Sequence, residues 1–321
     1  MQRPSRNVLA HTQNFLRSGA LVDRLLDASS IHAGDLVLDL GAGLGAITRR
    51  LASRGCEVFA IEKDADLWER LQQTMVDVPN VRVLHADLVE LRLPQRAYKV
   101  FSNIPFDVTA DVVSRLTRGT CPPEDAYLVV QREAADRFIG QPRTTLPAVL
   151  LFPWFEASLF YRFRRTDFAP APRVEVVMLR LRKRGPPLVA PTEAQLYRDF
   201  AVALFTSHAA CITDALQTVL GHQRALRLAR ALQIGPETST DLPPRRWLEL
   251  FQAAAHVAGE ELRWRVTHAE GRLREQQRKL RKLHRTRVRR LDRAIEHAPP
   301  QSRIPSSERS RTLPGLCVAT A

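Results

Sequence analysis

The sequence is poor in cysteine. It has only Cys56, Cys121, Cys211 and Cys317 in 321 residues, and no two of them form a Cys-x-x-Cys pair. Structural zinc sites and the disulfide frameworks of small secreted proteins both need cysteines in close, regular spacing. We therefore expect neither a metal centre nor a disulfide scaffold, and a protein that works in a reducing compartment, the cytoplasm.

Long apolar runs and internal repeats are also lacking. No segment approaches the roughly 18 consecutive apolar residues that a membrane-spanning helix requires. The first ten residues contain no apolar core of signal-peptide length, so we expect no secretory leader. The apolar fraction of 45% is ordinary for a globular protein, and the length suffices for two domains or for one domain with additions.

Acidic residues are scarce towards the end of the chain. The net charge is +14, and residues 262–321 contribute 16 Lys and Arg against 5 Asp and Glu. The other residues are nearly balanced, with 32 basic and 29 acidic side chains. A basic tail on a balanced body indicates a polyanionic partner, and we expect this to be nucleic acid rather than a membrane. A solubilising tail without a ligand is the alternative.

Strand-like and helical patterns alternate over the first 130 residues. Alternation of this kind predicts a mostly parallel sheet covered by helices on both faces, that is, an α/β fold of Rossmann-like type. Two further strands flank a proline-rich turn at 167–172, and we expect them to pair antiparallel at one end of the sheet. The expected strands are 36–40, 57–61, 81–85, 99–103, 126–130, 157–163 and 174–181, and the expected helices are 18–29, 44–53, 65–75 and 109–117.

The pattern changes after Gly185-Pro186-Pro187. Residues 193–257 have helical periodicity throughout and predict a small all-helical domain of three to five helices. Residues 272–293 hold eleven Lys or Arg and two acids on a loose helical stripe, and the chain beyond Pro299 is rich in Pro, Ser and Arg. We expect a catalytic domain at 1–187, a helical RNA-binding domain at 188–261, and a basic tail at 262–321 that is disordered or partly helical.

A glycine-rich loop follows the first strand. The strand ends at Asp39-Leu40 and continues into Gly41-Ala42-Gly43-Leu44-Gly45. Glycines allow a tight turn and a close approach of the backbone to a ligand, and the helix that follows directs its amides at that ligand. The spacing is neither the Gly-x-Gly-x-x-Gly of dinucleotide-binding proteins nor a phosphate-binding P-loop. A cofactor without phosphates fits this loop better.

Acidic residues end the next two strands. Glu62 follows the loop by about twenty positions, where a carboxylate can accept both ribose hydroxyl hydrogens. Asp87 ends the third strand, where it can accept a hydrogen bond from an adenine amino group. Strand ends are often acidic simply because solvent begins there. Their order after a glycine loop favours a cofactor site, and S-adenosylmethionine is the cofactor that fits best.

The fourth strand ends in Asn103, Ile104, Pro105 and Phe106. Asn103 has an amide oxygen that can accept a hydrogen bond, and Pro105 biases Ile104 towards an extended backbone with an outward carbonyl. Two such acceptors can hold an exocyclic amino group, while Phe106 stacks on the ring that carries it. We interpret this segment as the catalytic site of a methyltransferase that acts on a nucleobase nitrogen. No general base is required, because the sulfonium methyl is already activated and the alkylated amine loses its proton readily. Positioning and acceptor electrostatics then provide most of the catalysis. A simple strand-to-loop turn is the alternative.

These motifs together resemble the ribosomal RNA adenine N6-methyltransferases, in particular the Erm macrolide-resistance methylases. The resemblance covers about residues 11–260 and rests on six segments in the family's order. They are His11–Leu16, the glycine loop 39–45, Glu62, Asp87, the Asn-Ile-Pro-Phe motif at 103–106, and Phe168-Ala169-Pro170-Ala171-Pro172-Arg173-Val174.

The resemblance implies S-adenosylmethionine-dependent methylation of one adenine in 23S ribosomal RNA, which blocks binding of macrolides, lincosamides and streptogramin B. It also implies a helical C-terminal domain, a monomer, and an RNA substrate that is free or in pre-ribosomal particles. By position, the implied cofactor contacts are Gln13, Asn14, Leu16, Gly41, Gly43, Gly45, Glu62, Lys63, Asp87, Leu88 and Asn103. From its charge, we expect the tail to bind RNA through Arg278, Lys279, Arg281, Lys282, Arg285, Arg287, Arg289 and Arg290.

Two features depart from the family pattern, and three alternatives remain. Asp107 stands where the family often has Asn or Gly, and we expect it to point away from RNA or to pair with an arginine. The basic tail lies outside the shared domain. The alternatives are the small-subunit (16S) adenine dimethylases, whose motif usually reads Asn-Leu-Pro-Tyr, a DNA adenine methylase, and a non-catalytic RNA-binding relative.

Overall fold

The computed structural model describes residues 14–88, 90–235, 238 and 240–280, and the chain divides into two compact units, Met1–Glu270 and Gly271–Ala321. The first unit contains a seven-stranded sheet in the order β4-β3-β2-β5-β6-β9-β7. The strands are β2 (Leu36–Leu40), β3 (Glu57–Glu62), β4 (Val81–His85), β5 (Lys99–Asn103), β6 (Asp125–Gln131), β7 (Phe155–Arg162) and β9 (Val176–Lys183).

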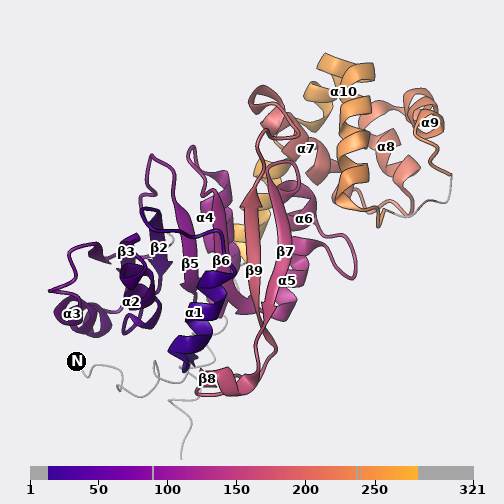
Figure 1. The fold of residues 1–321 in the computed structure, drawn as a ribbon. Coiled ribbons are helices and arrows are strands. Elements are labelled where there is room, and N and C mark those ends of the chain that lie inside the picture. Colours follow the sequence, from indigo (N-terminus) through magenta and orange to yellow (C-terminus); the bar gives the residue numbers. More distant parts are fainter. Residues whose placement is uncertain (1–13, 89, 236–237, 239, 281–321) are drawn as a thin grey trace, which may run out of the picture. The chain divides into compact units, whose positions relative to one another are not determined.

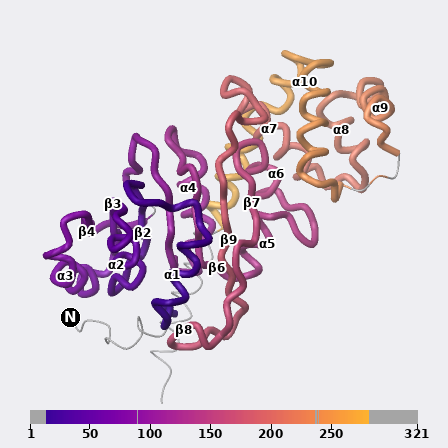
Figure 2. The backbone as a smooth tube through the Cα atoms, viewed as in Figure 1, coloured from indigo at the N-terminus to yellow at the C-terminus, as the bar shows by residue number. Residues whose placement is uncertain are grey.

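The sheet is parallel from β4 to β6 and antiparallel beyond it. All seven predicted strands and the expected mixed topology are confirmed. β9 lies between β6 and β7 (Figures 1 and 2), so the later of the two antiparallel strands is the one that joins the parallel part. Because β9 runs opposite to β6, its end at Lys183 lies at the amino end of the parallel strands, where the Lys183 amide donates a hydrogen bond to Glu124.

Alternate residues of the strands face two different cores. Val37, Tyr127 and Val129 pack against α1 (Gly19–Asp27) and α2 (Ala46–Ser53). Leu38, Leu128 and Val130 face the opposite side, against α4 (Thr109–Arg118), α5 (Arg132–Ile139) and α6 (Leu146–Leu151). Both faces of the strands are apolar, as expected for a parallel sheet covered by two helical layers.

Hydrogen-bonded caps fix where two of the predicted helices begin. The Ser18 hydroxyl accepts from the Leu21 amide ahead of α1, and the Asp64 carboxylate accepts from the Leu67 amide ahead of α3 (Ala65–Thr74). Each cap satisfies an amide that has no partner within its helix. Helices α5 and α6 were not predicted. α6 is only six residues long and almost wholly apolar, so it shows no helical period, and α5 follows β6 without a break.

A separate two-stranded sheet was also not predicted. β1 (Phe15–Leu16) pairs antiparallel with β8 (Phe168–Ala169), so that Leu16 lies opposite Phe168. Strands of two residues are too short to be recognised by alternation. This pairing brings Phe15 and Leu16 next to the proline-rich turn, although more than 150 residues separate them in the sequence.

The helical region has its own core. It contains α7 (Ala194–Phe205), α8 (Ile212–Leu220), α9 (His222–Ala231) and α10 (Pro244–Val266), packed around Tyr197, Phe200, Trp247 and Phe251. α10 is kinked at Gly259 and continues past residue 261, where we expected the domain to end. Leu262 and Val266 are fully buried in this core, so residues 262–270 belong with the first unit.

The second unit begins at Gly271. Its described part, residues 271–280, is helical, and Glu275 forms ion pairs with Arg278 and Lys279. The other predicted RNA-binding residues, from Arg281 to Arg290, lie outside the described residues. Within the described ranges no helix is both long and apolar enough to cross a membrane, and no group of His, Cys, Asp and Glu has the arrangement of a metal site.

Candidate active site

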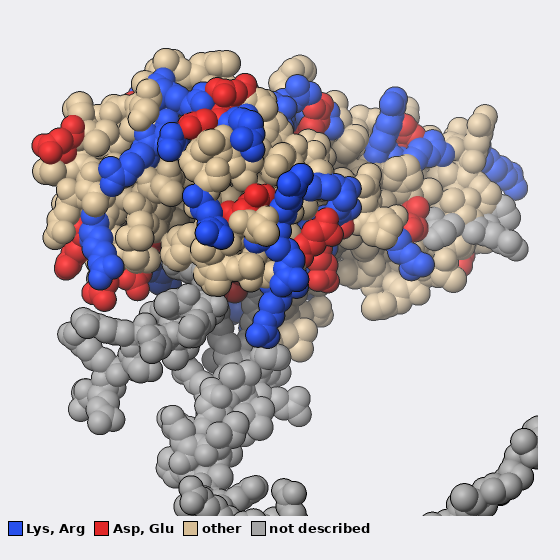
Figure 3. All heavy atoms as spheres, turned by 60° about the horizontal axis from the view of Figure 1, so that its bottom comes forward, with Lys and Arg blue, Asp and Glu red and all other residues tan. Residues whose placement is uncertain are grey.

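The predicted site residues meet at the carboxyl edge of the parallel strands. β2 ends at the glycine loop, β3 ends at Glu62, β4 leads to Asp87, and β5 ends at Asn103. In open α/β sheets ligands bind beyond this edge. Figure 3 turns the edge towards the viewer and shows basic and acidic side chains interspersed over the described surface there.

Glu62 holds the glycine loop in place. Its Oε2 accepts a hydrogen bond from the Gly43 amide at 2.8 Å, and its Oε1 accepts from the amides of Lys63 and Asp64, both at 2.9 Å. The residue is only 4% exposed. A carboxylate has about four acceptor positions, so these three amides leave room for about one ribose hydroxyl, not the two that the sequence suggested.

The glycine loop needs glycine for two separate reasons. Gly41, Gly43 and Gly45 all have positive φ, at 74°, 56° and 80°, where other residues are strained. A Cβ on Gly43 would stand 3.1 Å from the Phe15 ring, and one on Gly41 would stand 3.4 Å from Pro105 Cδ. The loop is thus in close contact with both the N-terminal segment and the Asn-Ile-Pro-Phe motif.

Asn103 is oriented by the N-terminal segment. Its Nδ2 donates a hydrogen bond to the backbone carbonyl of Asn14 at 2.7 Å. The two branches of an amide point in different directions, so with the nitrogen held in this way the oxygen is available as an acceptor. Ser102, which is fully buried, supports the same edge: its hydroxyl accepts from the Leu40 amide and donates to the Leu38 carbonyl.

The other residues of the Asn-Ile-Pro-Phe motif are partly buried in the core. Ile104 is 2% exposed and packs among the residues beneath α4. Pro105 has an extended backbone, with φ of −58° and ψ of 134°, and precedes a short 3-10 helix at Phe106–Val108. Phe106 is half-buried and packs against the core under α1, so only part of its ring can stack on a base.

Asp87 and Lys63 form an ion pair at the end of β4. Lys63 Nζ lies 2.6 Å from Asp87 Oδ2, and this contact, with a smaller contribution from Asp107, raises the pKa of Lys63. Asp107 is exposed, and the expectation that it points away from RNA or pairs with an arginine stays a prediction. Leu88, the residue after Asp87, is 8% exposed, and Leu16, opposite Phe168 in the β1–β8 pair, is 9% exposed, while Gln13 lies outside the described residues.

Asp39 is a buried carboxylate that the sequence did not single out as a titrating group. It is 1% exposed; its Oδ2 accepts a hydrogen bond from Thr48, and its Oδ1 has no partner within the described part of the chain. Burial raises the pKa of Asp39 to about 7, against the lowering effect of the Thr48 hydrogen bond, and the nearby charge of Glu62 raises it further. The group therefore titrates near neutral pH.

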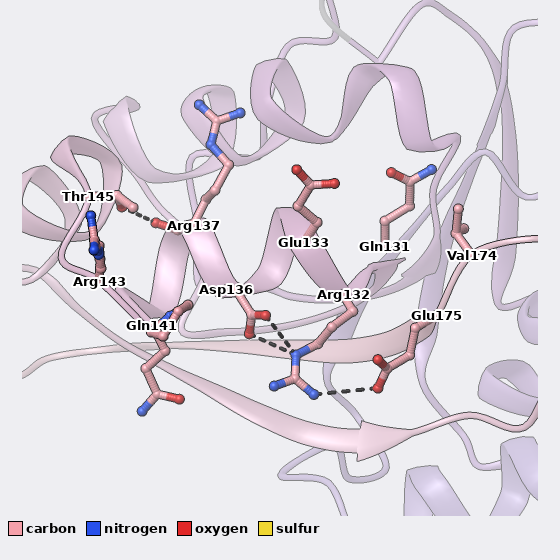
Figure 4. A pocket seen from close by; sticks show the side chains of 11 residues that line it. Gln131, Arg132, Glu133, Asp136, Arg137, Gln141, Arg143, Thr145, Val174 and Glu175 are labelled. Carbon is pink, nitrogen blue, oxygen red and sulfur yellow. Dashed lines mark hydrogen bonds and ion pairs between the residues drawn. The ribbon is translucent and has the colours of Figure 1, made fainter.

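A cavity of about 580 Å³ lies at the same edge, beyond β6. Arg132 extends along it and binds both oxygens of Asp136 and one oxygen of Glu175, as Figure 4 shows. A smaller hollow of about 200 Å³ adjoins it through Val174 and Glu175. The exposed arginines that line the two are Arg137, Arg143, Arg164, Arg165 and Arg173.

Sequence reasoning did not identify this arginine-lined surface. The arginines come from α5, the loop after it and the turn between β7 and β9, and none of the predicted cofactor residues lines either hollow. A scan for clustered charge could not have found them, because they are spread over about forty positions of the sequence. Antiparallel pairing of β9 with β6 brings them together.

The residues present fit S-adenosylmethionine. The amides of Gly41, Ala42, Gly43 and Gly45 donate hydrogen bonds within the protein, so the loop already has a fixed shape. Glu62 retains an acceptor position for ribose, and Asp87 stands at the next strand end. No basic side chain of the kind that grips phosphate lies within the loop itself. Fold and site therefore indicate the class: an α/β methyltransferase.

The chain belongs to the ribosomal RNA adenine dimethylase family, whose profile matches residues 6–256. It is 30% identical over 246 residues to the mycinamicin-resistance protein MyrB of Micromonospora griseorubida, covering 76% of this chain and 78% of that protein. It is 32% identical over 255 residues to an rRNA methyltransferase of Streptomyces thermotolerans, covering 75% and 81%. The protein is thus an S-adenosylmethionine-dependent rRNA methyltransferase.

Small-subunit enzymes and solved structures are similar as well. Ribosomal RNA small subunit methyltransferase A of Streptococcus pneumoniae (strain P1031) is 29% identical over 234 residues, covering 68% of this chain and 81% of that protein. The crystal structure of the 23S rRNA methyltransferase ErmE matches with a TM-score of 0.68 and 27% identity, over 75% of this chain and 99% of that one. The predicted fold class, with its Rossmann-like domain and helical C-terminal region, is confirmed.

Proposed function

We propose that this enzyme methylates the N6 of one adenine in 23S ribosomal RNA, in the cytoplasm, and so confers resistance to macrolide, lincosamide and streptogramin B antibiotics. The single observation that carries the chemistry is the contact between the two motifs. Asn103 is held by the Asn14 carbonyl directly beside the glycine loop, and Pro105 lies 3.4 Å from the Cβ position of Gly41. An amine held at Asn103 therefore lies next to a cofactor held at the loop.

The bound cofactor supplies an activated methyl group on a sulfonium. Asn103 Oδ1 accepts one hydrogen of the adenine N6 amino group, and the carbonyl of Ile104 accepts the other. With both hydrogens held in this way, Asn103 and Ile104 would orient the nitrogen to receive the methyl group that S-adenosylmethionine, held at the glycine loop and Glu62, would supply. The nitrogen then releases a proton to water. Positioning and acceptor electrostatics provide the acceleration.

The target adenine has to leave its stack to reach this site. Extrusion costs a few kcal/mol, less in unpaired or partly assembled RNA, and we propose that such RNA, free or in pre-ribosomal particles, is the substrate. The part of the Phe106 ring that is not packed on the core stacks on the extruded base. The enzyme acts as a monomer on one base at a time.

Basic groups near the site hold the backbone of the RNA. The arginine-lined surface, with Arg137, Arg143, Arg164, Arg165 and Arg173, lies at the edge where the target base must enter. Phosphate contacts from such side chains position RNA without reading its sequence and make binding depend strongly on salt. The basic tail adds further phosphate contacts. We expect the helical region, here residues 188–270, to bind RNA away from the target base, because it joins the sheet at the opposite edge.

A small-subunit RNA target is the second candidate. The likeness to ribosomal RNA small subunit methyltransferase A favours it, at 29% identity. The likeness to MyrB and to ErmE, and the Asn-Ile-Pro-Phe form of the motif, favour the large subunit.

One experiment separates the two candidates. The full chain is incubated with labelled S-adenosylmethionine and with purified 23S or 16S RNA, and the modified base is mapped and its methyls are counted. We expect label on a single adenine of 23S RNA in the antibiotic-binding region of the peptidyl-transferase centre. Label on two adjacent adenines of 16S RNA would show the small-subunit activity instead. If neither RNA is labelled, the chain is not a methyltransferase of these RNAs, and the non-catalytic RNA-binding alternative is favoured.

A further inference from the structure

Trp264 is unusually exposed for a tryptophan. It lies on α10 and is 81% exposed, whereas Leu262 and Val266, two positions away on either side, are fully buried. The buried pair fixes which side of the helix faces the core, so the Trp264 ring is directed outward. Large aromatic side chains left in solvent are typical of sites that stack on a partner.

The backbone beneath Trp264 is held in place by a charged bridge. Glu261 forms ion pairs with Arg224 of α9 and, at 3.0 Å, with Arg265 of α10. The bridge joins the two helices next to the tryptophan and neutralises the acidic charge of Glu261. Trp264 is therefore displayed on a fixed surface and not on a free segment.

The two helix segments that this bridge joins are rich in arginine. α9 carries Arg224, Arg227 and Arg230 and no acidic residue. The part of α10 after the kink at Gly259 adds Arg263 and Arg265, which are both exposed, against Glu260 and Glu261. Five arginines and two glutamates give this α9–α10 surface a net charge of +3. A polyanion that also offers flat rings matches both features.

We propose that the α9–α10 surface binds the RNA substrate outside the target site, with Trp264 stacking on an unpaired base and Arg227, Arg230 and Arg263 contacting phosphates. The proposal rests on the ribosomal RNA substrate proposed above. A second copy of this chain fits the surface poorly, because a symmetric contact would place two surfaces of charge +3 against each other.

The position of Trp264 determines how long the RNA has to be. A short turn after α10 leads to Glu270, which is 5% exposed in its side chain and binds Arg118 at the end of α4. α4 begins just after the Asn-Ile-Pro-Phe motif and has ten residues, so it is about 15 Å long. We therefore expect RNA that touches both Asn103 and the α9–α10 surface to extend by a comparable distance from the target base.

The test compares Trp264→Ala with Trp264→Phe, and with Val257→Ala as a matched control, because Val257 is a 50% exposed apolar residue of the same helix. Each full-length variant is assayed on a minimal stem-loop that carries the target adenine and on a long fragment of the same RNA. We expect Trp264→Ala to raise the KM for the long fragment about tenfold, within the range for one stacked base, with kcat unchanged. The stem-loop should show no change, and Trp264→Phe and Val257→Ala should resemble the wild type.

A direct binding signal accompanies the kinetics. Trp264 is one of four tryptophans, so the difference in fluorescence between wild type and Trp264→Phe reports on it alone. We expect the long RNA to quench this difference signal and the stem-loop to leave it unchanged. Arg263→Ala should flatten the salt dependence of binding, and Trp264→Ala should not.

Three results would overturn the proposal: equal KM values for wild type and Trp264→Ala on the long RNA, an equal loss on the stem-loop, or a dimer in light scattering that Trp264→Ala dissociates. Failure of the proposed function would look different. In that case the wild type would methylate neither RNA, while fluorescence quenching by the long RNA would still report whether the surface binds it.

Discussion

The side chain of Asn103 donates a hydrogen bond to the backbone carbonyl of Asn14, 2.7 Å away, across 89 positions of sequence. The contact links the end of β5 to the segment just before β1, and β1 is in turn paired with β8 in the proline-rich turn. Three motifs that are far apart in the sequence therefore fix the orientation of one amide. The orientation matters because only the amide oxygen can accept a hydrogen from the target amine.

Replacing Asn103 by Ala should abolish methyl transfer while leaving RNA affinity largely intact. The substitution removes the acceptor of the adenine amino group but none of the arginines that contact phosphate. Transfer of labelled methyl groups and RNA binding by filter retention measure the two effects. Gln73→Ala, at an exposed position of α3, is the control that should change neither. Turnover at the wild-type rate in Asn103→Ala would rule out the assigned role.

Phe106 should tolerate only another aromatic ring. We expect Phe106→Ala to lower kcat/KM by at least tenfold, and Phe106→Tyr and Phe106→Trp to retain most activity, because they keep a surface for stacking. Phe106 also packs on the core, so thermal unfolding of each variant has to be measured alongside activity. If all three variants lose activity equally at equal stability, stacking is not what Phe106 provides.

The glycine loop allows a matched comparison of two glycines. Gly43 and Gly34 both have positive φ, at 56° and 85°, so alanine at either position should cost about 1–2 kcal/mol of stability. Only Gly43 has a neighbour, the Phe15 ring, at 3.1 Å from the added Cβ, whereas no atom lies within 4 Å at Gly34. We therefore expect Gly43→Ala to weaken S-adenosylmethionine binding more than tenfold and Gly34→Ala to leave it unchanged, as measured by calorimetry. Equal affinities in the two variants would contradict this account of the loop.

Asp39 should make the stability of the cofactor-free protein depend on pH. Its pKa of about 7 in the folded state exceeds the ordinary value of 3.8, so the folded protein holds this proton more tightly than the unfolded chain. The free energy of unfolding should therefore fall as pH rises from about 4 to about 7 and level off above that range.

Asp39→Asn removes the titrating group and provides the measurement. As pH rises, the wild type should lose stability and the variant should not. The free energy of unfolding of Asp39→Asn relative to that of the wild type should therefore increase, by up to about 4 kcal/mol at 1.36 kcal/mol per pKa unit. Urea denaturation between pH 4.5 and 8 would show it. A difference that stays constant over this range would mean that Asp39 titrates at its ordinary pKa.

The role of the basic tail can be tested by truncation, and the truncated chain should end at Glu270 and not at residue 261. Truncation at 261 would delete Leu262 and Val266 from the helical core, together with the buried Glu270 that binds Arg118. A chain ending at Glu270 should keep its melting temperature and its activity on saturating RNA, but bind RNA more weakly and with a shallower salt slope. An unchanged slope in binding titrations would show that the tail does not contact RNA.

Much of the fold could be predicted because the local patterns are strong. The strands at 36–40, 81–85 and 99–103 have the predicted bounds, since each is a short apolar run bounded by polar residues and loops. The cofactor and catalytic motifs were found because each lies within a few consecutive residues. The β1–β8 pair was missed because each strand has only two residues. Helix α6 was missed because it is a six-residue, almost wholly apolar segment, and α5 because it follows β6 without a break.

Sequence by itself determined the strands, the glycine loop, the acids at Glu62 and Asp87, and the Asn-Ile-Pro-Phe motif, since these depend on residue type and local spacing. Only the tertiary structure decided how they act together. It showed that Glu62 already accepts three amide hydrogen bonds, that Asn14 orients Asn103, and that Trp264 stands exposed in a basic surface. These relationships join residues that are distant in the chain. They depend on long-range strand pairing and on burial, and a local sequence pattern contains information on neither.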